Sequence, residues 1–129
     1  PALRWTTRIA ALVTVGVGAR AGYGETWVAE RETQLAVIPV GYADGYRRAP
    51  GNFGFARHGS GTAPIISQVM MNHCLLDATE LQGVAVGAEI VLVGEADRSL
   101  EAIAERIGTI NEEVVAALSP DLERRYRAS

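Results

Sequence analysis

The chain has 129 residues, 48 % hydrophobic and 21 % charged, which is typical of one globular domain and not of a disordered segment. Its net charge of -3, without a clustered basic stripe that carries aromatic residues, argues against a nucleic-acid-binding surface. No apolar run approaches membrane-spanning length, and no signal-peptide pattern opens the sequence.

The first half of the chain is predicted to be mostly β. Residues 8–17 are small and β-branched and favour a strand, and the glycines that follow predict a turn around Tyr23. Residues 26–29 predict a short strand. Residues 34–40 are almost all apolar, which suits a strand buried on both faces, and Pro39 indicates an edge position or the end of that strand.

The middle of the chain continues this pattern. Residues 43–61 are rich in glycine and proline and predict an irregular segment with one short embedded strand. Residues 64–71 and 75–78 predict a further strand or strand pair. Residues 89–94 give the clearest strand signal in the sequence.

The last third is predicted to hold two short helices. Ser99 is a candidate N-cap, and Gly108 is placed to end the first helix. Thr109 and Glu112 have the spacing of a capping box at the start of a second helix, which Ser119 would end. The predicted buried face of that helix consists of Ile110, Val114 and Leu118. The sequence therefore predicts a single mainly β domain over residues 1–129, closed either as a barrel or as a sandwich.

The absence of lysine and the single cysteine limit the chemistry that this chain can perform alone. All 12 basic residues are arginine, so a reaction that needs a Schiff-base amine requires a lysine from outside this chain. The only cysteine, Cys74, excludes an internal disulfide and fits a reducing compartment. Cys74 and His73 are adjacent, but with one other histidine and no second cysteine they make a poor metal site, so we expect no metal. The sequence opens at Pro1, compatible with removal of an initiator methionine or with a piece of a longer protein.

Two tyrosines lie in glycine-rich turns that follow apolar runs. Tyr23 is flanked by Gly22 and Gly24, which allow a sharp bend and close approach of other groups. Tyr42 lies in a similar turn, where Asp44 is expected to bond nearby backbone N–H groups. From the residues alone, Tyr23 is either a displayed functional phenol or a turn tyrosine that packs on the surface.

Five pieces of sequence, in order, carry a family resemblance. They are GYGETW (22–27), PVGYADGYRR (39–48), API with MMN (63–72), VGAEIVLVG (86–94) and IGTINEE (107–113). Together they resemble the C-terminal domain of alanine racemase, of the fold type III pyridoxal-phosphate enzymes, over nearly the whole chain. The resemblance implies a small Greek-key β-barrel with two short helices near the C-terminus.

The resemblance also implies a partner and a cofactor. In the family, an N-terminal (β/α)₈ barrel binds pyridoxal phosphate through a lysine, and the enzyme is a cytoplasmic bacterial homodimer that interconverts L- and D-alanine. Tyr23 matches the catalytic tyrosine that serves one face of the substrate in the partner subunit's site. The resemblance therefore implies pyridoxal phosphate in the full-length enzyme, none bound by this chain alone, and no activity of the isolated chain.

Three further positions match substrate-binding residues. Tyr42 matches an entrance tyrosine, and its alternative is a half-buried aromatic that caps a strand end. Arg48 matches an arginine of the entry corridor, and its alternative is an exposed, solvated arginine. Met71 matches a methionine whose backbone lies beside the substrate, and its alternative is a core methionine.

Several positions depart from the family pattern. Asn72 stands where an aspartate is usual, and Ser67 and Gln68 replace a glycine and an arginine. Glu112 replaces the tyrosine that contacts the cofactor phosphate, and its carboxylate would repel that phosphate. These departures keep two alternatives open: a non-catalytic dimerisation or interaction domain of the same ancestry, and a racemase of another amino acid.

Overall fold

The structure, a computed structural model, describes residues 3–47, 54–94 and 98–126. The strands of these residues are β1 (Trp5–Arg8), β2 (Ala11–Val15), β3 (Arg20–Ala21), β4 (Trp27–Val28), β5 (Thr33–Ile38), β6 (Phe55–His58), β7 (Gly61–Ile66), β8 (Cys74–Asp77) and β9 (Glu89–Val93). The helices are η1 (Tyr23–Glu25), η2 (Tyr42–Asp44), α1 (Leu100–Ile107) and α2 (Asn111–Ala116), of which η1 and η2 are single 3₁₀ turns. None of the helices in this described part is long and apolar enough to cross a membrane.

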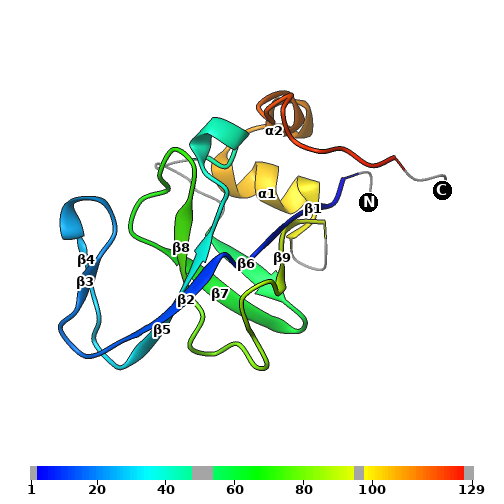
Figure 1. Ribbon diagram of the computed structural model, residues 1–129. Coiled ribbons are helices and arrows are strands. Elements are labelled where there is room, and N and C mark those ends of the chain that lie inside the picture. The colour runs from blue at the N-terminus through cyan, green and yellow to red at the C-terminus, as the bar shows by residue number, and fades with distance from the viewer. Residues whose placement is uncertain (1–2, 48–53, 95–97, 127–129) are drawn as a thin grey trace.

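Seven strands form one antiparallel sheet in the order β1-β9-β6-β7-β8-β5-β2. The strands at its two ends, β1 and β2, are separated in sequence only by Ile9 and Ala10. The Ile9 N–H donates to the Ala88 carbonyl at 3.0 Å, and the Ala10 N–H donates to the Val37 carbonyl at 2.8 Å. Because consecutive residues bond to opposite ends of the strand order, the sheet curls back on itself (Figure 1).

Within this sheet, β6, β7 and β8 are three consecutive antiparallel strands, and β5, which precedes them in the sequence, pairs with β8. The resulting order β5-β8-β7-β6 is a Greek key. The predicted mainly β fold, barrel-like with two short C-terminal helices, is confirmed. The single strand predicted over residues 8–17 is wrong: it is two strands, because the chain leaves one end of the sheet and joins the other at Ile9.

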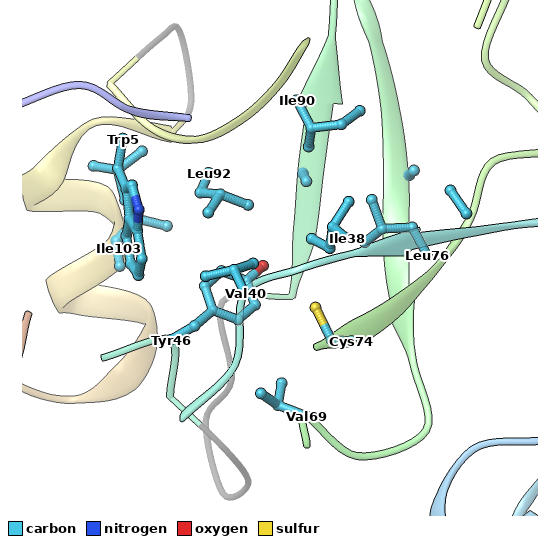
Figure 2. Close-up of a cluster of buried hydrophobic side chains, with 14 of the residues drawn as sticks. Trp5, Ile38, Val40, Tyr46, Val69, Cys74, Leu76, Ile90, Leu92 and Ile103 are labelled. Atoms are coloured by element: carbon cyan, nitrogen blue, oxygen red, sulfur yellow. The ribbon is translucent and has the colours of Figure 1, made fainter. Parts of the chain in front are cut away.

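The core lies between the curled sheet and α1. Ile38, Leu76, Ile90 and Leu92 are fully buried on the inner face of the sheet, and α1 contributes Ile103 (Figure 2). Burying each of these side chains stabilises the fold by about 1.5–3 kcal/mol. The rings of Trp5 and Tyr46 meet edge to face with centroids 5.8 Å apart, at the end of the core beside α1.

The first helix begins and ends where the sequence predicts. The Ala102 N–H donates to Ser99 Oγ at 3.1 Å, and Gly108 closes α1 with φ +77°. The capping box predicted for the second helix is wrong, because the Thr109 N–H donates to the Ala104 carbonyl at 2.9 Å and so still belongs to the end of α1. The N-cap of α2 is Ile110, without a side-chain bond.

The predicted buried face of α2 is partly wrong. Val114 is buried and Leu118 packs against the core, whereas Ile110 is 62 % exposed. Ile110 is exposed because α2 begins one residue later than predicted, so that Ile110 precedes its first turn rather than lying within it.

Candidate functional site

The Tyr23 turn lies at the tip of a hairpin that projects from the curled sheet. The hairpin pairs β3 with β4, and η1 connects these strands at the end opposite to β2 and β5 (Figure 1). Gly22 and Gly24 have φ +83° and +71°, values that L side chains rarely adopt. The predicted glycine turn is therefore present, and it places the Tyr23 backbone at the tip of this hairpin.

The loop after β7 contacts this turn. A Cβ on Gly22 would overlap Cβ and Oγ of Ser67, so glycine is needed for the close approach as well as for its φ. Thr26, on the other side of the turn, lies with its Oγ1 3.1 Å from Ser67 Oγ. The tip of the hairpin thus touches the barrel through Ser67.

The same loop continues to the Tyr42 turn. The N–H of Tyr42 donates to the Met70 carbonyl and the N–H of Ala43 to the Met71 carbonyl, each at 3.0 Å. A Cβ on Gly41 would overlap both carbonyl oxygens. Segments predicted to carry site residues are therefore adjacent: residues 22–26, 67–71 and 41–45, here called the rim.

Within the rim, individual residues lie as follows. The Gly41 N–H donates to Asp44 Oδ2 at 2.9 Å, which confirms the predicted turn role of Asp44. Tyr42 is 42 % exposed and Met71 is 53 % exposed. The alternative of a core methionine is therefore wrong, because the Met71 loop lies on the surface and not under the sheet.

The two tyrosines of the GYADGY motif have opposite environments. Tyr46 is fully buried, and loss of hydration raises its pKa well above the usual range, since burial disfavours the phenolate. Tyr42, four residues earlier, stays accessible at the rim. Only Tyr42 can meet another molecule without unfolding of the core.

An open cavity of about 310 Å³ adjoins the Tyr42 turn. It is lined by Tyr42, Gly45, Arg47, Ile107, Thr109, Glu113, Val114 and Ala117. The Arg47 guanidinium reaches the Ile107 carbonyl at 3.5 Å, and Glu113 supplies a carboxylate on the α2 side. Sequence reasoning missed Arg47, although the paired arginines after GYADGY offered a signal for it.

The remaining positions singled out in the sequence are exposed, buried in the core or outside the described residues. Arg48 lies outside the described residues. Asn72 and His73 are exposed, whereas Cys74 is buried in the core, where burial raises the pKa of its thiol from 9.0 to about 12. Across the parts of the chain that the structure describes, no three His, Cys, Asp or Glu side chains form a group that could hold a metal ion.

The residues of this chain do not fit pyridoxal phosphate on their own. The chain has no lysine, and the first turn of α2 carries two carboxylates, Glu112 and Glu113. Glu112 is exposed on this turn, where a phosphate dianion would be repelled.

Comparison with known proteins gives one consistent family. The model of the alanine racemase C-terminal domain matches residues 2–126. Alanine racemase of Halothermothrix orenii is 42 % identical over 130 residues, which cover 98 % of this chain and 34 % of that protein. Alanine racemase of Cutibacterium acnes is 39 % identical over 129 residues, with 98 % and 34 % covered. This chain thus spans about a third of the length of these relatives.

Solved structures agree with the sequence relatives. Alanine racemase from Acinetobacter baumannii superposes with a TM-score of 0.82 at 32 % identity, over 92 % of this chain and 33 % of that one. The enzyme from Bartonella henselae, solved with covalently bound pyridoxal phosphate, gives a TM-score of 0.88 at 27 % identity, over 96 % and 34 %.

Proposed function

Because the chain belongs to the alanine racemase C-terminal domain family, we propose that it is the C-terminal domain of an enzyme that interconverts L- and D-alanine. It would follow an N-terminal pyridoxal-phosphate-binding barrel in a cytoplasmic homodimer. Its part in the reaction would be to present Tyr23 to the active site of the partner subunit.

The rim carries this proposal. Racemisation needs a proton removed from one face of the α-carbon and returned on the other, so two groups must approach from opposite sides. Tyr23 lies on the tip of a projecting hairpin, a position suited to reach a neighbouring subunit. The phenol oxygen of Tyr23 would accept or donate the proton on its face. A free phenol has a pKa of about 10, so a cation or donor from the other domain must favour the phenolate.

Tyr42 and Met71 would border the same substrate. Backbone hydrogen bonds join their two loops, and both side chains are exposed at the rim. An amphipathic ring at this position can line an entrance while its hydroxyl stays hydrated. Arg48 would steer the substrate carboxylate, since a cation in an entry corridor raises the local concentration of anions.

The cofactor would come entirely from the preceding domain. The chain lacks the amine that a Schiff base requires, and its exposed Glu112 is unsuited to a phosphate. We therefore expect the isolated chain neither to take up pyridoxal phosphate covalently nor to racemise alanine. Covalent uptake, visible as a new absorption band on this chain, would contradict that expectation.

Glu112 favours a second candidate function, a non-catalytic dimerisation domain. A carboxylate in place of a phosphate-binding side chain would weaken cofactor binding even in the complete protein. Racemisation of another amino acid is a variant of the first candidate. It is suggested by Gln68 and Asn72, which replace the arginine and the aspartate that are usual in the family near the substrate.

The test uses the full-length coding sequence with its cofactor lysine. Tyr23→Phe removes one phenol oxygen and should lower kcat/KM by about 10²–10⁴-fold in both directions of racemisation, because an enzyme cannot change the equilibrium between two enantiomers. Tyr126→Phe is the matched control, because Tyr126 is 90 % exposed and lies outside the rim. An unchanged rate in Tyr23→Phe would eliminate Tyr23 as a proton-transfer group. A wild-type protein that forms dimers but racemises no amino acid would favour the second candidate.

A further inference from the structure

The β3–β4 hairpin has little internal stability. Each strand has two residues, and a two-stranded hairpin is marginal in water without further support. Its base is anchored at Ala29, which is buried and whose N–H donates to the Ala19 carbonyl at 2.8 Å. Since that anchor lies at the base, the tip that carries Tyr23 needs a contact of its own.

Ser67 supplies a contact at the tip and does so in a strained conformation. Its φ is +57°, and the only other non-glycine residue with positive φ in residues 3–47, 54–94 and 98–126 is Glu25, in the Tyr23 turn itself. L side chains adopt this region at a cost, and such residues persist when the surrounding structure holds them there. Both strained residues therefore lie where the hairpin tip meets the barrel, Ser67 on the barrel side and Glu25 in the turn.

The side chain of Ser67 makes two specific contacts that a glycine could not make. Its Cβ and Oγ lie over the bare Cα of Gly22, and its Oγ pairs with Thr26 Oγ1 at 3.1 Å. Gly22 and Thr26 bracket the η1 turn, so one side chain contacts both ends of the segment that holds Tyr23.

We propose that Ser67 is a positioning residue for Tyr23, in which the Ser67–Thr26 hydroxyl pair over Gly22 fixes the turn against the barrel. We call this contact of Ser67 with Thr26 and Gly22 the latch. The inference rests on the proposed function of Tyr23, but the latch itself can be measured without catalysis. The competing explanation is that serine is merely tolerated in a turn that glycine would serve better.

Amide hydrogen exchange can distinguish the two explanations, a Ser67 that fixes the turn and a serine that is merely tolerated there. The reporter is the Glu25 amide, which donates to the Gly22 carbonyl at 3.0 Å. Ser67→Ala, Thr26→Val and Ser67→Gly should each make this amide exchange about fivefold faster, as expected for one lost neutral hydrogen bond. Ser60→Ala, in the exposed β6–β7 turn, is the matched control and should leave it unchanged.

Ser67→Gly is decisive because it relieves the strain and removes the hydroxyl together. If serine were only tolerated, exchange at Glu25 would slow or stay constant in this variant, and the latch would be refuted. The double variant Ser67→Ala with Thr26→Val should speed exchange by less than the product of the two single effects, since the two side chains share one interaction. Fully additive effects would also refute the pair.

The catalytic arm uses the full-length racemase. Ser67→Ala should lower kcat about tenfold with KM within about twofold, because a displaced proton-transfer group affects the reacting state more than substrate binding. Thr26→Ser keeps the hydroxyl and should retain the wild-type kcat. If Tyr23→Phe leaves racemisation intact, the proposed function fails; if Ser67→Ala speeds exchange at Glu25 but leaves kcat unchanged, the latch stands and its positioning role fails.

Discussion

The curled sheet and the β3–β4 hairpin differ in how their residues are buried. Four of the six residues of β5 are buried, whereas every residue of β3 and β4 is at least partly exposed. The sheet is held by a continuous apolar core, and the hairpin by its base at Ala29 and by Ser67 at its tip. The proposed site thus combines a stable scaffold with a weakly supported element that reaches outward, which is common for binding and catalytic loops.

The aromatic residues divide between core and rim in the same way. Tyr46 and Trp5 fill the core beside α1, while Tyr42 and the Tyr23 turn belong to the rim. Residues that stabilise the fold and residues proposed for function are therefore separate, even within the GYADGY motif. Substitutions should separate them as well.

The largest expected effect is on the core. Tyr46→Ala should lower the free energy of unfolding by about 3–5 kcal/mol, because it removes a buried ring and leaves a cavity against Trp5. Tyr42→Ala, the matched control, should cost less than about 1 kcal/mol because Tyr42 is 42 % exposed. Urea unfolding followed by circular dichroism measures both, and equal costs would contradict the division of the motif into core and rim.

A smaller effect should appear on raising the pH. Burial raises the pKa of the Cys74 thiol from 9.0 to about 12, so the folded state keeps a proton that the unfolded chain releases. The stability linked to this proton is fully present below pH 9 and is lost progressively as the pH rises towards 12. Between pH 9 and 10 the free energy of unfolding should fall by about 1 kcal/mol.

The composition makes this alkaline effect measurable. No lysine titrates in this pH range, because all 12 basic residues are arginine. Cys74→Ala should remove most of the decrease between pH 9 and 10, whatever it does to stability at neutral pH; the smaller remainder comes from buried Tyr46, whose raised pKa acts in the same direction. A decrease as large in Cys74→Ala as in the wild type would show that the buried thiol is not its main source.

Local signals made much of the fold predictable from sequence. Ser99 and Gly108 set the ends of α1, because helix capping depends only on residues close in the sequence. The strand β9 was predictable because its signal, the apolar run 89–94, is also local. The break at Ile9 was missed, because it follows from the two ends of the sheet meeting and not from local preference. Thr109 was misassigned because two adjacent helices compete for the same residue.

The candidate site divides in the same way. The glycines around Tyr23 and the turn role of Asp44 were local and were predicted correctly. The contact of Ser67 with Gly22 and Thr26 joins residues more than 40 positions apart, and no spacing rule connects them. The surface position of Met71 likewise depends on where its loop lies relative to the sheet.

The smallest expected effect on global stability comes from the hairpin itself. Gly22→Ala introduces a Cβ that overlaps Ser67, and it does so at a residue whose φ of +83° disfavours alanine. This substitution should therefore detach the tip and speed hydrogen exchange at the Glu25 amide. Its global free energy of unfolding should nevertheless change by less than about 0.5 kcal/mol, because the hairpin can open without the sheet. Gly59→Ala is the matched control: it has φ +59° and no neighbour within 4 Å, yet it lies between β6 and β7 of the sheet. That strain should cost about 1–2 kcal/mol globally, so a larger global loss in Gly22→Ala than in Gly59→Ala would show that hairpin and sheet unfold as one unit.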